Sequence, residues 1–309
     1  MKPGTAIIPK LSSTISSRSF KVRGDDFSLE FDRSFGHLKS WTHGGCELLH
    51  HDVESSSPFQ LGFWRPPTDN DASWQTATWK HWGLDSLTVQ NRSFEFYRIS
   101  DGEVQVTSTA YISPPILAWG FLVETTYQVL GNGHVIVKVH MMPKGAFPTN
   151  LPRAGWDIKL SKSLDRAEWF GLGPGESYND KKSAQKVGIY RASAEELHTP
   201  YDIPQENGNR VDTRWVKILN TRGVGFKASL SGSKRSPGLF QWAASRYPAL
   251  ELERTKHEAE LEKDDKIHFR LDVDVAGVGT GACGPGTNEV DKVKCEEMEF
   301  EIRLQPVSA

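Results

Sequence analysis

Alternation of apolar and polar residues with a period of two is the feature that most constrains how this chain can fold. It recurs in short runs flanked by turn residues, among them 27–31, 104–107, 135–140, 267–273 and 298–304. Side chains alternate between the two faces of a strand, so such runs predict antiparallel strands with one polar face. Helical periodicity is scarce, and we expect a short helix at 74–82. The sequence therefore predicts an all-β fold, a large antiparallel β-sandwich.

The length of 309 residues allows one large β domain or two smaller ones. We interpret the polar, Ser-rich segment 1–18 as a flexible leader and 19–309 as a single sandwich domain. The leader lacks the apolar stretch of a signal peptide, and no apolar run is long enough to span a membrane. The three cysteines, Cys46, Cys283 and Cys295, are scattered, so we expect free thiols and a cytoplasmic protein.

Charge and motif spacing exclude several classes of partner. The net charge of −2 provides no basic field for nucleic acid, and no run of Lys and Arg suggests a lipid surface. Asp69, Asn70 and Asp71 are adjacent, so one strand cannot aim all three at one cation. The glycine-rich segment 277–286 lies between predicted strands, unlike a nucleotide-binding loop before a helix. The sequence therefore predicts no metal and no cofactor.

The segment 204–210 is the densest in hydrogen-bonding side chains. It contains Glu206, Asn207, Asn209 and Arg210, and Arg214 follows closely. Glycine, asparagine and proline favour a loop here. Fixed amides, carboxylates and guanidinium groups can hold a polyhydroxylated ligand. A buried loop whose polar groups satisfy only one another is an equally good interpretation.

Five segments, in this order and spacing, resemble a known family. The segments are Phe63 to Asp71, Trp169 to Lys181, Tyr201 with Pro204 to Trp215, Thr255 to Leu261, and Gly277 to Pro285. Together they resemble the C-terminal domain of glycoside hydrolase family 2 β-galactosidases, which is a separate small subunit in some bacteria. The resemblance covers roughly residues 20–305. It implies a large antiparallel β-sandwich similar to galactose mutarotase.

The resemblance also implies where the chemistry of the whole enzyme lies. Family enzymes retain configuration by means of two glutamates on a TIM-barrel domain. A chain filled by a sandwich has no room for that barrel, so we do not expect it to hydrolyse lactose alone. The implied partners are a carbohydrate ligand and a barrel-bearing large subunit whose sugar site this domain would complete.

One loop of the family's C-terminal domain reaches the galactose site, in many members with a Trp. The matching position here is Cys283, as in fungal and yeast members, and a thiol offers less stacking area than an indole. A small residue in a tight glycine-rich turn is an equally good interpretation of Cys283. A second departure is Lys181, where the family usually has Arg, because Lys lacks the planar fork that grips a carboxylate twice. The predicted substrate-binding residues are Trp64, Arg65, Asp69, Asn70, Tyr178, Asn207, Asn209, Arg210, Arg214 and Cys283.

Two other functions remain open at this point. The chain could be a stand-alone enzyme, a sugar epimerase or another isomerase or cyclase, with Glu206 and His257 as acid and base. Against this, Glu206 could simply pair with Arg210 or Arg214, and His257 could cap the end of a strand. The chain could also be a carbohydrate-binding module without chemistry, which predicts an open aromatic platform.

Overall fold

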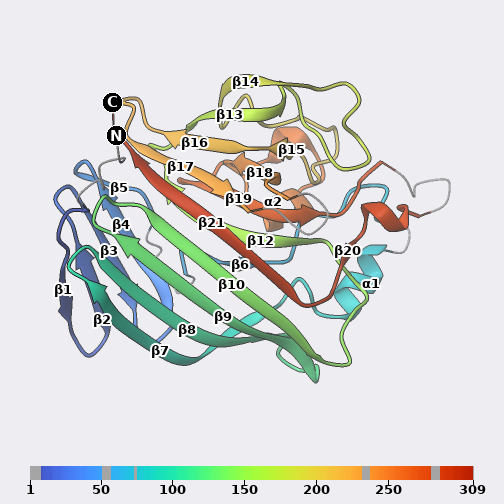
Figure 1. The fold of residues 1–309 in the computed structure, drawn as a ribbon. Coiled ribbons are helices and arrows are strands. Elements are labelled where there is room, and N and C mark those ends of the chain that lie inside the picture. The colour runs from blue at the N-terminus through green and yellow to red at the C-terminus, as the bar shows by residue number, and fades with distance from the viewer. Residues whose placement is uncertain (1–7, 51–56, 73–74, 232–236, 280–285, 309) are drawn as a thin grey trace.

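A nine-stranded antiparallel sheet is the largest element of the fold (Figure 1). The computed structural model describes residues 8–50, 57–72, 75–231, 237–279 and 286–308. The strand order of this sheet is β14-β13-β16-β17-β21-β10-β9-β8-β7. Its strands are β7 Thr88–Ser100, β8 Glu103–Ser113, β9 Trp119–Leu130, β10 Val135–Gly145, β13 Arg166–Gly173, β14 Lys186–Ser193, β16 Trp215–Leu219, β17 Gly225–Leu230 and β21 Met298–Val307.

Two five-stranded sheets accompany the large one, in the orders β1-β2-β3-β4-β5 and β15-β18-β19-β12-β6, with a short pair β11-β20. Their strands are β1 Ser12–Ile15, β2 Ser19–Arg23, β3 Phe27–Asp32, β4 His37–His43, β5 Cys46–Glu47, β6 Phe59–Gly62, β11 Asn150–Leu151, β12 Arg153–Ser161, β15 Arg210–Thr213, β18 Phe240–Ser245, β19 Lys266–Val275 and β20 Val293–Lys294. The helices are α1 Gln75–His81 and α2 Ala249–Arg254, with 3-10 turns at Glu258–Glu260 and Glu289–Asp291. The prediction of an all-β, antiparallel fold is confirmed.

Aromatic contacts show which sheets face each other. Trp169 on β13 contacts Trp242 on β18, with ring centroids 5.3 Å apart. Phe20 on β2 stacks on Phe96 on β7 at 4.1 Å. Both five-stranded sheets therefore pack on the same large sheet, and the core lies between the layers. Burying aromatic side chains of this size is a dominant favourable term in folding.

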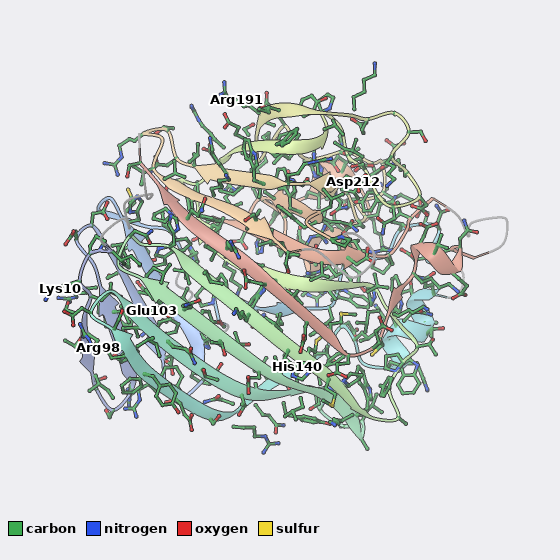
Figure 2. All side chains as sticks on the ribbon, in the orientation of Figure 1. Lys10, Arg98, Glu103, His140, Arg191 and Asp212 are labelled. Carbon is green, nitrogen blue, oxygen red and sulfur yellow. The ribbon has the colours of Figure 1, made fainter. Side chains whose placement is uncertain are left out.

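The period-two pattern matches the layers. On β19, Ile267, Phe269 and Leu271 are fully buried between the sheets, and the alternate residues face the other side. On the large sheet, Val135, Val137 and Val139 on β10 are buried, whereas His140 on the same strand is on the outer face (Figure 2). The five alternating runs noted in the sequence all lie in strands.

The structure can be compared with two local predictions, the helix at 74–82 and the leader at 1–18. The predicted short helix at 74–82 corresponds to α1, next to β20 in Figure 1. The range 1–18, predicted as a flexible leader, contains β1, which pairs with β2 from Ser12↔Arg23 to Ile15↔Phe20. These four residues are thus part of a sheet. Across the described ranges, every helix is too short or too polar to cross a bilayer.

Candidate functional site

Loops far apart in the sequence meet where the chain leaves β19. The carboxylate of Asp180 accepts the N–H groups of Val278 at 3.0 Å and of Gly279 at 2.9 Å. The amide of Asn70 donates to the carbonyl of Val278. A Cβ atom on Gly277 would lie 2.4 Å from the Asp180 carboxylate, so only glycine allows this approach. The start of segment 277–286 is therefore held from two sides.

A buried ion pair supports this junction. Arg65 and Asp71 are almost completely buried, and Arg65 Nη1 donates to Asp71 Oδ2 at 2.7 Å. Arg65 Nη2 also donates to the carbonyl of Gly277 at 3.4 Å. Burial lowers the pKa of Arg65, but the neighbouring carboxylate of Asp71 outweighs burial and leaves the pKa raised. We call Arg65, Asn70, Asp71 and Asp180 the loop frame.

A second cluster lies beside the frame, around Glu176. Its carboxylate accepts from Lys181 Nζ at 2.7 Å, from the Gly208 N–H at 2.8 Å, and from the Tyr201 hydroxyl. Lys181 makes one contact with Glu176, as expected for an ammonium in place of a guanidinium. Burial raises the pKa of Glu176, but the three donors outweigh burial and leave the pKa lowered. Glu176 thus ties the 175–181 loop to the 201–210 loop.

This network predicts how acid affects stability. A carboxylate whose pKa is lowered in the folded state stabilises the fold above its unfolded pKa, and this contribution is lost as the pH falls through the folded pKa. We expect Glu176→Gln to lower the melting temperature near neutral pH, and we expect this deficit to shrink as the pH falls below the ordinary glutamate pKa of about 4.3. Thermal melts across this range test the expectation, with the exposed Glu260→Gln as control. A deficit that persists undiminished at the lowest pH would contradict it.

Glu206 is held by partners on other elements. Both carboxylate oxygens accept from Arg270, with Nη1 to Oε2 at 2.8 Å, and Oε1 also accepts from the Tyr178 hydroxyl at 3.1 Å. Burial first, and then the carboxylates of Glu206 and Glu176, raise the pKa of Tyr178 well above its usual value, so its hydroxyl stays protonated. Glu206 therefore pairs with Arg270, not with Arg210 or Arg214 as considered from the sequence.

A cavity of about 390 Å³ lies over strands β6, β12, β19 and β18. Arg153 is fully buried beside it and donates to Asp272 Oδ1 at 2.6 Å and to Asp157. Burial raises the pKa of Asp272 to about 6, and the guanidinium groups of Arg153 and Arg270 oppose the rise. The acidic, basic and histidine residues that line the cavity are Arg153, Asp157, Lys159, Glu206, Asp264, Lys266, His268 and Arg270.

His268 and Asp264 form a pair at the edge of this cavity. The ring nitrogen Nε2 of His268 lies 2.8 Å from Asp264 Oδ2. Burial lowers the pKa of His268, and Asp264 opposes the shift without cancelling it. The imidazole is therefore mainly neutral at pH 7.

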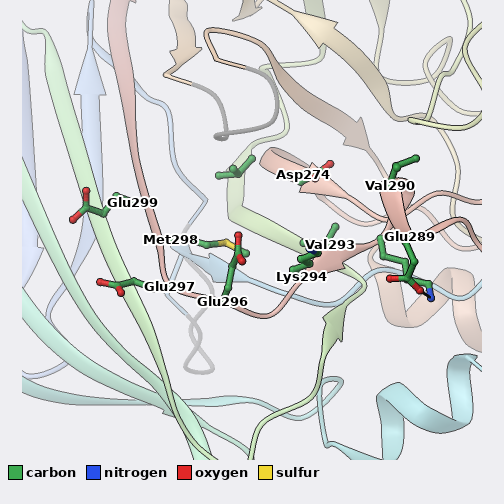
Figure 3. Close-up of a pocket in the computed structure, with 11 residues that line it drawn as sticks. Asp274, Glu289, Val290, Val293, Lys294, Glu296, Glu297, Met298 and Glu299 are labelled. Carbon is green, nitrogen blue, oxygen red and sulfur yellow. Dashed lines mark hydrogen bonds and ion pairs between the residues drawn. The ribbon is translucent and has the colours of Figure 1, made fainter.

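Another cavity, of about 650 Å³, lies between the end of β19 and the region of β20 and β21 (Figure 3). Val290 lies at one end and Glu299 at the other, with Met298 and Glu296 between them. Val290 is 70% exposed. Five acidic residues and two basic ones line the cavity, namely Asp274, Glu289, Glu296, Glu297, Glu299, Lys292 and Lys294. The charged side chains of this lining are mainly acidic, and its apolar part comes from Val273, Val290, Val293 and Met298.

The predicted substrate-binding residues fall into two groups. Trp64 lines the 390 Å³ cavity, and its Nε1 donates to Glu253 at 3.1 Å. Asp69 is exposed and pairs with Gln205 at 3.3 Å. The other described residues of the set are buried or bonded to backbone: Asn207, which also lines the cavity, to Gln205 and Thr199, Asn209 to Ser177, Arg210 to Leu197, Gly208 and Pro174, and Arg214 to Asp212.

Arg210 shows why the 204–210 segment is so polar. Its guanidinium lies 5.5 Å from the centre of the Trp169 ring and donates to main-chain carbonyls. Burial lowers its pKa to about 10, which still leaves it charged at neutral pH. The segment largely satisfies its own groups and those of neighbouring loops, which is the second of the two interpretations that we considered.

The predicted acid–base pair is not assembled. His257 is exposed, immediately before the 3-10 turn at Glu258–Glu260, and does not line the cavity that Glu206 lines. Cys283 lies outside the described residues. Among the described residues, no three His, Cys, Asp or Glu side chains gather closely enough to hold a metal ion.

Sequence reasoning missed the floor of the 390 Å³ cavity. Arg153, Asp157, His268 and Arg270 were not among its candidates. One signal was available: the run 267–273 places His268, Arg270 and Asp272 on one face of a single strand. A face made only of ionisable groups on a strand central to its sheet indicates a polar cavity rather than a solvated surface.

The comparisons with known proteins agree on one family. A family model described as beta galactosidase small chain matches residues 23–304. The β-galactosidase of Kluyveromyces lactis is 31% identical over 289 residues, which is 93% of this chain and 27% of that protein. The β-galactosidase of Vibrio cholerae is 30% identical over 297 residues, with 90% and 27% covered. This chain thus spans about a quarter of the length of these relatives.

Among solved structures, a GalM/aldose epimerase homologue from C. elegans aligns with a TM-score of 0.49 and 10% sequence identity. The alignment covers 96% of this chain and 100% of that one. Likeness at this level does not bear on function.

Proposed function

Because this chain belongs to the β-galactosidase small-chain family, we propose that it completes the sugar site of a barrel-bearing partner in a family 2 glycoside hydrolase. In this proposal the partner supplies the two catalytic glutamates, and this chain supplies the segment 277–286 as one wall of the site. The observation that carries the proposal is the set of hydrogen bonds by which the loop frame holds the backbone of Gly277–Gly279. The assembly would work in the cytoplasm, in keeping with the free thiols of Cys46 and Cys295.

The physical argument rests on positioning. A loop that contacts a sugar contributes to catalysis only if it is held close to its productive geometry, and rigid neighbours provide this. Asp180 accepts two successive N–H groups, and Arg65 and Asn70 donate to the carbonyls of the same stretch. The loop frame therefore binds both N–H and C=O groups of the backbone at residues 277–279, where the segment begins. Cys283 would face the ligand from this loop and give less stacking than a Trp.

We further propose that the barrel-bearing partner docks on the 650 Å³ cavity between Glu289 and Glu299. Two residues that line this cavity, Glu289 and Val290, follow the segment 277–286 closely in the sequence. Its mainly acidic lining suits a partner surface that presents Lys and Arg side chains around an apolar contact. Exposed Val290 is the apolar anchor on this side.

The docking surface predicts a charge-reversal effect. We expect Glu296→Lys to weaken binding of this chain to a barrel-bearing partner about five- to tenfold, since a rim charge contributes on the order of 1 kcal/mol. A suitable partner is Kluyveromyces lactis β-galactosidase truncated to remove the matching segment, with binding followed by calorimetry. Glu95→Lys on β7, at the edge of the large sheet, is the control. Equal affinities for the two variants would argue against this surface.

A further inference from the structure

We propose that the 390 Å³ cavity over β6, β12, β19 and β18 binds a neutral polyhydroxylated molecule of monosaccharide size. This site is formed by other residues than the loop frame, so it goes beyond the function proposed above. A volume of this size lies in the range of small-molecule sites, which combine apolar walls with a few fixed polar groups.

The residues at the floor of the cavity lie in rows across neighbouring strands, and the register of strand pairing determines which residues share a row. Directly paired residues on neighbouring antiparallel strands point to the same face. One row runs from Ser245 to His268 to Lys159. The next row runs from Ala243 to Arg270 to Asp157 to Gln60. All seven residues line the cavity.

Glycines make room for the charged part of these rows. A Cβ atom on Gly62 would lie 1.9 Å from Asp157 Oδ2 and 2.4 Å from Arg153 Nη2. A Cβ atom on Gly155, which pairs with Gly62, would lie 2.3 Å from Asp272 Oδ1. Side chains at these two positions would displace the ion pairs. The absence of side chains at Gly62 and Gly155 therefore leaves the space that Arg153, Asp157 and Asp272 occupy.

The charges of the cavity favour a neutral ligand over an anion. Arg153 is already paired with Asp157 and Asp272, and Arg270 is paired through both of its terminal nitrogens with Glu206. An anion would have to displace a carboxylate from a largely buried guanidinium, which costs several kcal/mol of desolvation. The two guanidinium groups are thus used inside the protein, and the two lysines of the lining, Lys159 and Lys266, also have partners.

Hydrogen-bonding capacity remains for hydroxyl groups. The side chain of Asp157 is 38% exposed and lines the cavity, and its contact with Arg153 uses Oδ1, so Oδ2, beside Gly62, can still accept a hydrogen bond. Among the described residues, neither the amide of Gln60 nor the hydroxyl of Tyr247 has a side-chain hydrogen-bond partner, and both line the cavity. Hydroxyl groups both donate and accept, so a polyol can use all three. The rings of Trp64 and Tyr247 supply apolar walls for its C–H faces.

Calorimetry and ligand-observed NMR of the full chain with D-galactose, D-glucose and inorganic phosphate test this inference. We expect saturable millimolar binding of at least one sugar and none of phosphate. Ala243→Leu, which fills the floor, and Asp157→Asn, which removes an acceptor, should each weaken sugar binding at least tenfold. Gln60→Ala should weaken sugar binding severalfold. Because Gln60 is only half-buried, this variant still tests the site if either of the other two fails to fold.

Glu260→Gln, at an exposed position outside both sites, is the matched control and should leave this binding unchanged, while Asp180→Asn reports on the loop frame. Two results would overturn the inference: no saturable binding of either sugar to the folded wild-type chain, or binding that survives Ala243→Leu. Binding lost in Asp180→Asn but retained in Asp157→Asn would assign the sugar to segment 277–286 instead. Competition by phosphate would contradict the neutral ligand class. The cavity variants and the loop-frame variants are measured separately. A negative result for sugar binding in the cavity therefore does not affect the proposal that this chain assembles with a barrel-bearing partner.

Discussion

Asp71→Ala is expected to lower the free energy of unfolding by about 3–5 kcal/mol, as measured for buried ion pairs that lose one partner. Asp71 is 2% exposed and accepts from the fully buried Arg65 and from the Thr68 N–H and hydroxyl. Removing the carboxylate leaves a guanidinium uncompensated in the interior. Urea denaturation followed by tryptophan fluorescence gives the change.

The adjacent Asp69→Ala is the matched control. Asp69 is exposed, and its carboxylate has one long contact with Gln205, so we expect a change within about 0.5 kcal/mol. A similar loss in both variants would mean that the 66–72 turn, rather than the Arg65–Asp71 pair, carries the stability. An Asp71→Ala protein with an unchanged free energy of unfolding would contradict the claim that the buried Arg65–Asp71 pair stabilises the fold.

Asp180→Ala is expected to reduce galactoside hydrolysis by the assembled enzyme at least tenfold, which corresponds to about 1.4 kcal/mol in the barrier. Asp180 fixes the N–H groups of Val278 and Gly279, and no other side chain of the described residues accepts from these two groups. Without it the root of segment 277–286 loses its fixed position while the sandwich stays folded.

Asp180→Asn separates charge from geometry. The amide keeps one acceptor oxygen, so it can hold one of the two N–H groups, and we expect intermediate activity. The assay is hydrolysis of o-nitrophenyl galactoside, with thermal melts to show that each variant is folded. A folded Asp180→Ala protein with full activity would remove the loop frame from the account.

The strands were predictable from the sequence, and the reason is visible on β19. Ile267, Phe269 and Leu271 alternate with ionisable residues, and burial on one face of the strand follows from that pattern. The glycine-rich segment was also recognisable, since a run of glycines between strands indicates close backbone approach. The structure adds the reason at one position, because a Cβ atom on Gly277 would lie 2.4 Å from the Asp180 carboxylate.

The partners of the polar residues were not predictable, because they depend on register between distant segments. Glu206 pairs with Arg270, which is 64 residues away, and not with the nearby Arg210. The cavity over β19 needs four strands in register, and no single segment carries that information. Segment 1–18 was judged on composition alone, which cannot detect the pairing of Ser12–Ile15 with β2.

The most direct test of the central claim is the activity of a chimera. This chain would replace the matching segment of Kluyveromyces lactis β-galactosidase, and hydrolysis of o-nitrophenyl galactoside would be compared with the enzyme lacking that segment. We predict that the chimera hydrolyses the substrate well above the truncated enzyme and that Asp180→Ala removes most of the gain. A folded chimera no more active than the truncated enzyme would contradict the proposal that this chain completes a galactoside site.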